Sequence, residues 1–529
     1  MARPPAEILA GVVQWYGRKP MTAATSDKKE EEKVETEEKL GFVQTIKTFP
    51  RRFFLGCGIE MWERLAYYGV RSVVPLYIAQ ANDPGGLHFT QAQKGSIFAA
   101  WALVQSLVPM VSGGFADRYG YKKTIALSVT LACLGYVLMG NLRSYPGFFA
   151  ACLVLALGTA LFKPGIQGTL AQSMSKKNSS VGWGLFYWLV NVGAALAPLM
   201  GGFLRTKSWP LVFYGSAVAM SLNYLMLFTY EEVDSGADKR KGPIRVLVDT
   251  FKNILDLRLL AIIALFSGFW MMLYQLWDLM PNFYADWVSS TPFVKANAWL
   301  PTSWIQDDPR GPQLKQENAL NLNAALVVLF VIPISFLVAR LRVMSAITVG
   351  VLIATIGTVV YGSSPSVYML FCGIALFSLG EMLTGPKKSE YFSLIAPPGK
   401  KALYLGYVNI PIAIGQALGA KLAGWQYGTN GEKATLALKY FATKTDRHGP
   451  GEWDGNVDHL ADFVGIKRTA AAEELGKLLG QDANQISDLL WTTYKPYHVW
   501  YWFSAVGLVS LVGLVVFSQL SKRWKDMNV

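Results

Sequence analysis

An apolar stretch near the start of the chain carries four ionisable side chains, which are Glu60, Glu63, Arg64 and Arg71. The stretch, residues 58–78, reads GIEMWERLAYYGVRSVVPLYI and is long enough to cross a bilayer as a helix. A charged side chain at the centre of a bilayer costs about 2.5–3.5 kcal/mol on insertion scales, so charges in a span mark a functional site by default. Carboxylates beside an arginine can take up and release a proton, and a second arginine can hold an anionic solute.

The polar and aromatic residues of this stretch share one face of the predicted helix. The spacing i, i+3, i+4, i+7, i+8 and i+11 is filled by Glu60, Glu63, Arg64, Tyr67, Tyr68 and Arg71. Glu60 and Arg64 are four residues apart with the acid first, the order in which an ion pair best supports a helix. We therefore expect the stripe to face the protein interior. The alternative explanation is an ion-pair network that only holds helices together.

Three other apolar runs each hold one charge near their middle. These charges are Lys163 in GTALFKPGIQGTL, Asp278 in FWMMLYQLWDLMPNFY and Glu381 in FSLGEMLTGPKKSEYF. Together they can compensate one another around a hydrated cavity, and pairs that break and re-form between two bundles suit alternating access. Near the end of the last of these runs, snorkelling or pairing at a gate would account for Lys387, Lys388 and Glu390.

Apolar runs of about twenty residues recur along the chain, and each can cross ~30 Å of hydrocarbon as a helix. The chain has 529 residues, of which 52% are hydrophobic and 16% charged, whereas soluble proteins carry about 25% charged residues. We predict an all-α membrane protein with twelve transmembrane helices. They lie near residues 54–80, 90–115, 122–141, 145–171, 182–203, 210–229, 254–287, 318–340, 342–362, 366–395, 402–426 and 496–520.

A polar segment divides these runs into two sets of six, which predicts two six-helix bundles facing each other across a central cavity. The expected divisions are an N-terminal tail (1–53), a first bundle (54–229), a linker (230–253), a second bundle (254–520) and a C-terminal tail (521–529). The second bundle includes a polar insert, 427–495, before the last helix. We expect this insert to form a small cap outside the membrane.

The net charge of +13 follows the topology and does not form a patch for nucleic acid. Lysine and arginine gather in alternate short loops, for example at Arg118, Lys122 and Lys123. By the positive-inside rule, both termini are cytoplasmic and the insert is extracytoplasmic. The chain is expected in the plasma (inner) membrane as a monomer, in contact with lipid and without nucleic acid.

Six segments of the chain resemble one family of transporters. EMWERLAYYG resembles the E-x-x-E-R-F-x-Y-Y signature of the proton-coupled oligopeptide transporters, a branch of the major facilitator superfamily. GGFADRYGYKKT is similar to the superfamily's loop between helices two and three. The family's helices four, five, seven and ten are resembled by GTALFKPGI, FYWLVNVGAALAP, FWMMLYQ and GEMLTGP. The resemblance therefore spans nearly all twelve helices and implies the major facilitator fold.

The resemblance also implies roles for residues. Glu60, Glu63 and Arg64 would couple transport to protons, with the proton as coupling ion and no other cofactor. Substrate would be held by Arg71, at the peptide carboxylate, and by Tyr67 and Tyr68.

In the second half of the implied site, Lys163 would pair with Glu381 across the bundles. Glu381 would receive the peptide amino group, and Asn191 would hydrogen-bond the peptide backbone. A zwitterion needs both a cationic and an anionic pole, and this arrangement supplies them.

The sequence departs from the family pattern at several positions. The phenylalanine after E-x-x-E-R is Leu65, and the acid often present on helix seven is Tyr274, with Asp278 one turn later. Asp278 either substitutes for that acid or the usual pair between helices one and seven is rearranged. The asparagine expected early in helix eight is matched only loosely by Asn323. The insert is not part of the family core.

The leading hypothesis is a secondary active transporter, a proton-coupled symporter of di- or tripeptides or similar small zwitterions. The alternative keeps the fold and changes the solute to nitrate, an amino-acid conjugate, a sugar or a drug-like amphiphile. An enzyme is not expected, because no nucleophile with its base and no metal cluster stands out. Metal-type residues occur in the insert, but with irregular spacing, at His448, Asp454, His459 and Asp462.

Overall fold

The computed structural model describes most of the chain. The described residues are 42–175, 178–232, 256–339, 341–397, 401–446 and 451–524. Most of the predicted N-terminal tail and linker, His448, and the end of the C-terminal tail lie outside them. Helix α2 (Phe42–Lys47) begins the described part. Everything below concerns Ile46–Val529, which forms one compact unit.

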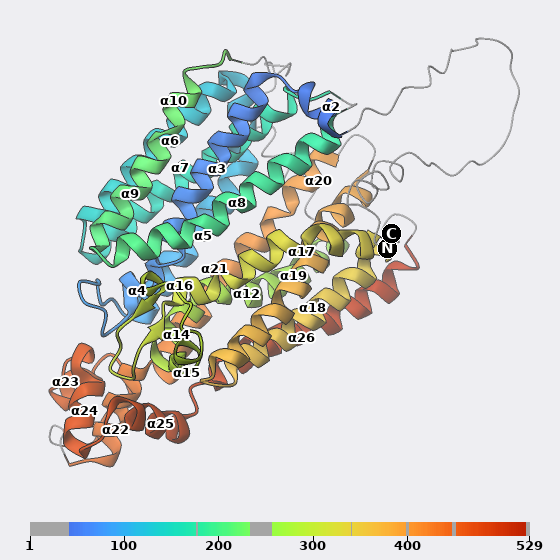
Figure 1. The fold of residues 1–529 in the computed structure, drawn as a ribbon. Helices are drawn as coiled ribbons and strands as arrows, with labels where there is room; N and C mark the ends of the chain where they lie inside the picture. Colours follow the sequence, from blue (N-terminus) through green and yellow to red (C-terminus); the bar gives the residue numbers. More distant parts are fainter. Residues whose placement is uncertain are drawn as a thin grey trace, which may run out of the picture. The chain divides into compact units, whose positions relative to one another are not determined.

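The first bundle is built from helices in the first half of the chain, coloured blue to green in Figure 1. Its elements are α3 (Arg51–Arg71), α5 (Gln91–Tyr119), α6 (Tyr121–Asn141), α7 (Tyr145–Ala171), α8 (Ser179–Arg205), α9 (Trp209–Ser221) and α10 (Asn223–Leu227). Helix α3, which carries the charged stripe, packs against α8, α9 and α7. The stripe-bearing helix is thus held inside the bundle.

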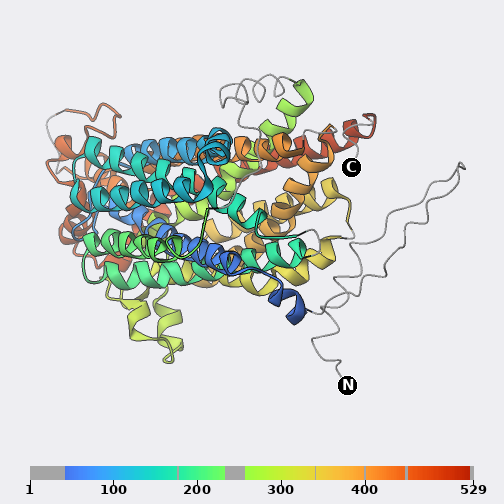
Figure 2. The same ribbon diagram turned by 90° about the horizontal axis from the view of Figure 1, so that it is seen from above.

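The second bundle, coloured yellow-green to red, follows with more interruptions (Figures 1 and 2). Its elements are α12 (Leu257–Leu273), α13 (Gln275–Asp278), α14 (Met280–Trp287), α16 (Gln316–Leu320), α17 (Leu322–Ala339), α18 (Val343–Gly362), α19 (Val367–Leu394), α20 (Lys401–Tyr407), α21 (Asn409–Asn430) and α26 (His498–Ser521). Helix α19, which carries Glu381, packs mainly on α18 and α17.

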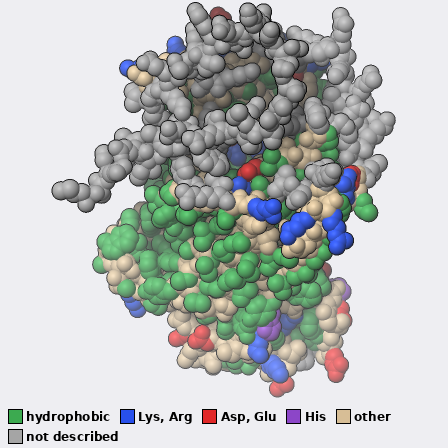
Figure 3. Space-filling view, turned by 90° about the vertical axis from the view of Figure 1, so that its right-hand side faces the viewer, with side chains coloured by type: hydrophobic (Ala, Val, Ile, Leu, Met, Phe, Trp, Pro, Cys, Tyr) green, Lys and Arg blue, Asp and Glu red, His purple; other side chains and the backbone are tan. Residues whose placement is uncertain are grey.

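Ten of the described helices are long and apolar enough to cross a membrane by themselves. Helices α3 and α21 complete the twelve; α3 misses that criterion because its stripe is charged. Large apolar side chains face outward on these helices, and Val509 of α26, for example, is 71% exposed. Figure 3 shows hydrophobic side chains covering much of the described surface in that view. The prediction of an integral membrane protein with twelve spanning helices in two bundles is confirmed.

Several predicted spans are divided into shorter helices, and in two of them a break follows a charged residue. The run predicted at 54–80 forms α3, which ends at Arg71, and a short helix α4 (Val74–Ala79) with Pro75 in its first turn. The run predicted at 254–287 forms α12, α13 and α14, and α13 ends at Asp278. Both charged residues therefore lie at the last position of a helix.

The bundles meet at the end of the molecule from which the insert projects, and we call this end the insert side. Helix α5 packs closely along α21, α4 contacts α14, and α8 contacts α16 and α17. The first of these contacts requires glycine: a Cβ added at Gly424 of α21 would lie 2.6 Å from the carbonyl oxygen of Gln91. Helix α5 starts at this point because Thr90 and Gln93 form a reciprocal capping box.

Two extramembrane segments lie on the insert side. The segment after α14 contains α15 (Thr291–Ala296), the 3-10 turn η1 (Thr302–Trp304) and an antiparallel pair of strands, β1 (Ile305–Gln306) and β2 (Gln313–Leu314). The insert itself consists of α22 (Lys433–Lys444), α23 (Leu460–Val464), η2 (Arg468–Ala470), α24 (Ala471–Leu479) and α25 (Ala483–Tyr494) (Figure 1).

Candidate transport site

The charged stripe of α3 is buried, as its spacing predicts. Glu60, Glu63 and Arg64 are 5%, 1% and 6% exposed. The Nε atom of Arg64 lies 2.5 Å from a carboxylate oxygen of Glu63 and 3.2 Å from one of Glu60. The predicted Glu60–Arg64 pair is therefore present, and one guanidinium is shared by two carboxylates. We call these three residues the acid–arginine cluster.

The acid–arginine cluster is suited to exchanging a proton. Within the described part of the chain, Glu60 Oε2, Glu63 Oε1 and Arg64 Nη2 have no hydrogen-bond partner. Lys163 of α7 is close enough to interact electrostatically with all three side chains. Two carboxylates that share one arginine are poorly neutralised, so one of them can accept a proton while the other stays paired.

The two tyrosines of the stripe line the same face of α3. Tyr67 donates a hydrogen bond to Gln105 of α5 at 2.8 Å, and its ring meets that of Tyr68 edge to face with centroids 5.1 Å apart. The guanidinium of Arg64 lies 5.5 Å from the centroid of the Tyr67 ring. The aromatic pair therefore links the acid–arginine cluster to the helix end at Arg71.

Arg71 forms an ion pair with Asp278, and this pair joins the two bundles. The side chains are 6% and 1% exposed. The guanidinium also lies 4.4 Å from the centroid of the Phe98 ring. The helix-one to helix-seven pair is thus made through Asp278, one of the two possibilities left open by the sequence. Arg71, expected to hold a peptide carboxylate, is engaged by a protein carboxylate in this conformation.

Lys94 of α5 strengthens this contact and was missed in the sequence. Its Nζ atom donates to Asn282 Oδ1 at 2.7 Å and to the backbone oxygen of Asp278 at 3.1 Å. Lys94 is 2% exposed. Asn282 in turn donates to Gln80 of the first bundle at 3.1 Å. We call the four residues Arg71, Lys94, Asp278 and Asn282 the insert-side lock.

A residue of the insert makes a second bridge between the bundles. Arg468 donates to both carboxylate oxygens of Glu432 at 2.8 and 3.1 Å, and to the backbone oxygens of His88 and Phe89 at 2.8 Å each. Gln91 of α5 also donates to Glu432, at 2.9 Å. We call this arrangement the Arg468 clamp. It ties the insert to the loop that precedes α5.

The predicted ion pair between Lys163 and Glu381 is absent among the described residues. Lys163 lies beside the acid–arginine cluster of its own bundle, whereas Glu381 accepts a hydrogen bond from Asn323 at 3.0 Å. The loosely matched asparagine of helix eight therefore holds the carboxylate that the lysine was expected to hold. Lys388, two turns further along the same face of α19, is close enough to interact electrostatically with both Lys163 and Glu381.

Asn191 is only partly buried, and its amide donates to the backbone oxygen of Tyr187 on the same helix at 2.8 Å. Tyr187 is 49% exposed and interacts electrostatically with Glu381 of the other bundle. Asn191 therefore lies one turn from a side chain that reaches the Glu381 region. Among the described residues, Asn191 makes no hydrogen bond to the backbone of another helix.

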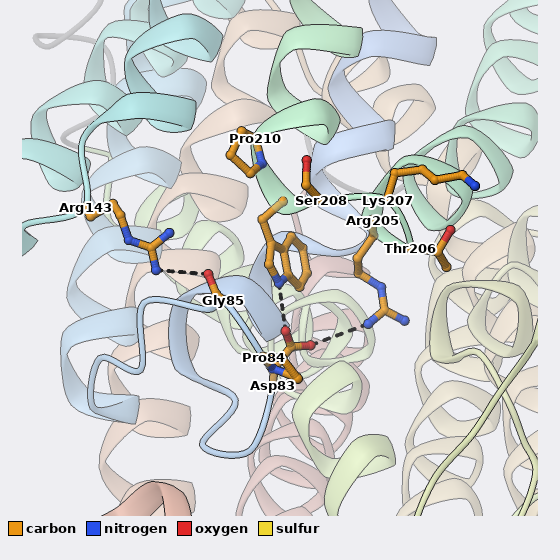
Figure 4. Close-up of a pocket in the computed structure, with 10 residues that line it drawn as sticks. Asp83, Pro84, Gly85, Arg143, Arg205, Thr206, Lys207, Ser208 and Pro210 are labelled. Atoms are coloured by element: carbon orange, nitrogen blue, oxygen red, sulfur yellow. Dashed lines mark hydrogen bonds and ion pairs between the residues drawn. The ribbon is translucent and has the colours of Figure 1, made fainter.

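A surface pocket of about 420 Å³ lies on the insert side, lined by Asp83, Pro84, Gly85, Arg143, Arg205, Thr206, Lys207, Ser208, Trp209 and Pro210 (Figure 4). Two of its cations already have partners: Arg143 donates to the backbone oxygen of Gly85, and Arg205 pairs with Asp83. Arg205 also pairs with Glu317 of α16 at 3.3 Å. The pocket thus belongs to the polar contacts between the bundles.

The described metal-type residues of the insert, Asp454, His459 and Asp462, are on its surface. His459 contacts Asp454 at 2.7 Å, and both side chains are more than half exposed. The described residues contain no group of three or more histidine, cysteine, aspartate or glutamate side chains that could hold a metal ion.

A family model described as the Major Facilitator Superfamily matches residues 63–420. The chain belongs to this superfamily. It is 32% identical over 196 residues to a di-/tripeptide transporter of Lactococcus lactis subsp. cremoris, covering 35% of this chain and 39% of the relative. It is also 25% identical over 334 residues to the multidrug resistance protein MdtH of Edwardsiella ictaluri, covering 61% of this chain and 75% of MdtH.

Among solved structures, this superfamily member is similar to a POT family transporter in complex with 5-aminolevulinic acid. The TM-score is 0.61 with 16% identity, and the match covers 91% of this chain and 99% of the other. The fold is shared over nearly the whole chain. The resemblance to peptide transporters drawn from the sequence is confirmed, although the chain spans only about two fifths of the length of the peptide transporter it matches in sequence.

Proposed function

We propose that the protein is a proton-coupled symporter of di- or tripeptides or similar small zwitterions that works by alternating access. The observation that carries this proposal is that the acid–arginine cluster and Arg71 lie on one helix. The acid–arginine cluster occupies the middle of α3, and Arg71, which is paired with Asp278 of the opposite bundle, is its last residue. A rigid helix can transmit a change at the cluster to the contact between the bundles.

The insert-side lock and the Arg468 clamp suggest how the cycle runs. We assign the insert side to the outside of the plasma (inner) membrane and both termini to the cytoplasm, following the distribution of cations. The conformation described is then closed to the outside. Opening that side requires Arg71 to leave Asp278, and it frees the guanidinium to meet the carboxylate of an incoming solute.

The other site residues couple the proton and contact the rest of the solute in this proposal. Protonation of Glu60 or Glu63 releases Arg64 and Lys163 from part of their counter-charge. Glu381 receives the amino group of the solute. Tyr67, Tyr68 and Asn191 line its path. The protein acts as a monomer, uses the proton as coupling ion without another cofactor, and moves its solute without changing it chemically.

The experiment is uptake of a labelled dipeptide by vesicles that contain the purified protein, under an inward proton gradient. We expect accumulation that collapses when a protonophore removes the gradient. Glu60→Gln is expected to lose gradient-driven accumulation, because a residue that cannot ionise cannot exchange a proton. Exchange of labelled for unlabelled dipeptide, measured without a gradient, is the control for folding. The proposal would be refuted if the proton gradient drove no uptake of any peptide and the Glu60→Gln substitution changed nothing.

A second candidate solute is a drug-like amphiphile, and the longer match to MdtH favours it. A thermal-shift screen distinguishes the two, since a ligand that binds the folded state stabilises it by mass action. Stabilisation by dipeptides supports the first proposal. Stabilisation by drug-like amphiphiles alone, with no response to any dipeptide, supports the second.

A further inference from the structure

Lys388 is a buried lysine that the transport cycle proposed above does not use. It is 6% exposed, and its Nζ atom lies 4.0 Å from the centroid of the Trp270 ring. It follows Glu381 by seven residues, two turns along α19, so the two side chains share one face of the helix. Lys388 forms no hydrogen bond or ion pair with any residue that the structure describes.

The neighbouring lysine is different. Lys387 is similarly buried, at 7% exposed, but its Nζ atom lies 2.9 Å from a carboxylate oxygen of Glu390. Burial of a lysine without a counter-charge is costly, which is why charged groups inside proteins are normally paired. Lys387 meets this expectation and Lys388 does not, so Lys387 provides a matched control.

A second lysine without a described partner, Lys163, approaches from the other bundle. Lys163 also lacks a hydrogen bond or ion pair with a described residue, and it is close enough to Lys388 for the two charges to interact. Two ammonium groups from opposite bundles repel each other. A carboxylate placed between them would compensate both, in charge-assisted hydrogen bonds. Trp270 adds a donor, since its indole Nε1 is buried without a partner among the described residues.

The arginines of the site are less available to a solute than these lysines. Arg64 is held by Glu60 and Glu63, and Arg71 is held by Asp278. In this conformation a solute carboxylate therefore meets lysine rather than arginine.

The balance of charge indicates which solute fits. When a proton neutralises one of its two carboxylates, the acid–arginine cluster has no net charge, and Lys163 loses its local counter-charge. The side chains left to be compensated are then Lys163, Lys388 and Glu381. A matching solute has two carboxylates and one ammonium group. A dipeptide with one acidic side chain has this set of charges.

Resting on the proposed function, we propose that Lys163 and Lys388 form a two-lysine subsite that binds an acidic side chain of the substrate. The preferred substrates are accordingly di- and tripeptides that contain aspartate or glutamate. Lys388 is then a specificity-determining residue, and Glu381 beside it orients the amino group of the same solute.

The test compares two nearly isosteric dipeptides, Ala-Glu and Ala-Gln, by their dissociation constants for the purified full-length protein. We expect the wild type to bind Ala-Glu at least about tenfold more tightly, as one added charge-assisted contact implies. Lys388→Gln should remove about tenfold of this preference, through weaker binding of Ala-Glu. Lys388→Arg should keep the preference, and Lys387→Gln should have no effect on it.

Equal affinity of the wild type for both dipeptides would by itself overturn the proposed subsite. An unchanged preference in Lys388→Gln that still binds Ala-Gln would overturn it as well. Gradient-driven uptake of Ala-Gln without a preference for Ala-Glu defeats the subsite and leaves the transport proposal standing. Preferential binding of Ala-Glu without proton-driven uptake supports the subsite and defeats the transport proposal.

Discussion

Replacing Arg468 by alanine should open the insert side of the protein. On opening, the insert moves with the second bundle, so Arg468 keeps Glu432 and loses the carbonyl oxygens of His88 and Phe89, each 2.8 Å away. Hydrogen bonds from a charged donor contribute about 1.5–3 kcal/mol each. The guanidinium side chain is 17% exposed, so the low end of that range applies. Two such bonds amount to about 3 kcal/mol, or about 100-fold in the ratio of open to closed molecules.

Pulsed electron-spin distance measurement can detect this change. Spin labels at exposed Asn141 of the first bundle and Asn430 of the second, in a background without the four native cysteines, report the separation of the bundles on the insert side. We expect one short distance in the parent and a major longer distance in Arg468→Ala. Arg468→Lys should lie between them, because an ammonium group cannot reproduce the four-bond geometry of the guanidinium.

The matched control is Lys477→Ala in the same insert. Lys477 pairs with Glu473 on the surface, at 2.7 Å with both side chains more than half exposed. Such a pair contributes little to stability, so the distance distribution should not change. If Arg468→Ala kept the short distance of its parent while remaining folded, the clamp would be a local brace of the insert, and the reasoning above would be refuted.

Three further predictions follow from other contacts. Asp278→Asn leaves Arg71 buried without its counter-charge, which should destabilise the protein by about 3–5 kcal/mol and lower its melting temperature. Adding Arg71→Met to this variant should partly restore the melting temperature, because it removes the unpaired charge. Gly424→Val places a side chain against the carbonyl oxygen of Gln91, 2.6 Å from the new Cβ, so the spin-label distance should lengthen. An unchanged distance would show that α5 and α21 accommodate the side chain without separating. Burial, aided by a neighbouring arginine, lowers the pKa of Lys433 from 10.5 to about 7. Between these values the unfolded chain binds the additional proton, so the melting temperature of the wild type should rise from pH 7 toward pH 10, and Lys433→Met should flatten that rise.

The fold and the charged stripe could be predicted because both follow from local patterns. Glu60 and Arg64 are four residues apart on one helix, so their contact needs only a helix to form. A signal for the insert-side lock was also present. Lys94 lies within the predicted run 90–115, and Asp278 and Asn282 are four residues apart on one face. A charged residue within one predicted span does not identify the other span on which its partner lies.

The Arg468 clamp had no signal of this kind. Arg468 and Glu432 are 36 residues apart in a polar insert, and Arg468 reaches backbone oxygens of a loop some 380 residues earlier. Every residue has a backbone carbonyl oxygen, so the residue types do not reveal a contact to one. The predicted Lys163–Glu381 pair is not made in the conformation described, because pairs between the bundles depend on which side is closed. It stays a prediction for the other conformation.

The polar bridges between the described parts of the two bundles are distributed unequally, and this inequality bears on the predicted pair of Lys163 and Glu381. Arg71–Asp278, Lys94–Asn282 and the Arg468 clamp all lie on the insert side. Toward the opposite ends of α7 and α19, Lys163 and Lys388 have no counter-charge from the facing bundle within the described residues. An alternating-access cycle must exchange one set of contacts for another of similar strength, or the protein would stay in one state. Groups left without partners on the open side are the ones available for that exchange, so closing this side would bring Lys163 and Glu381 toward the pairing that the sequence predicts.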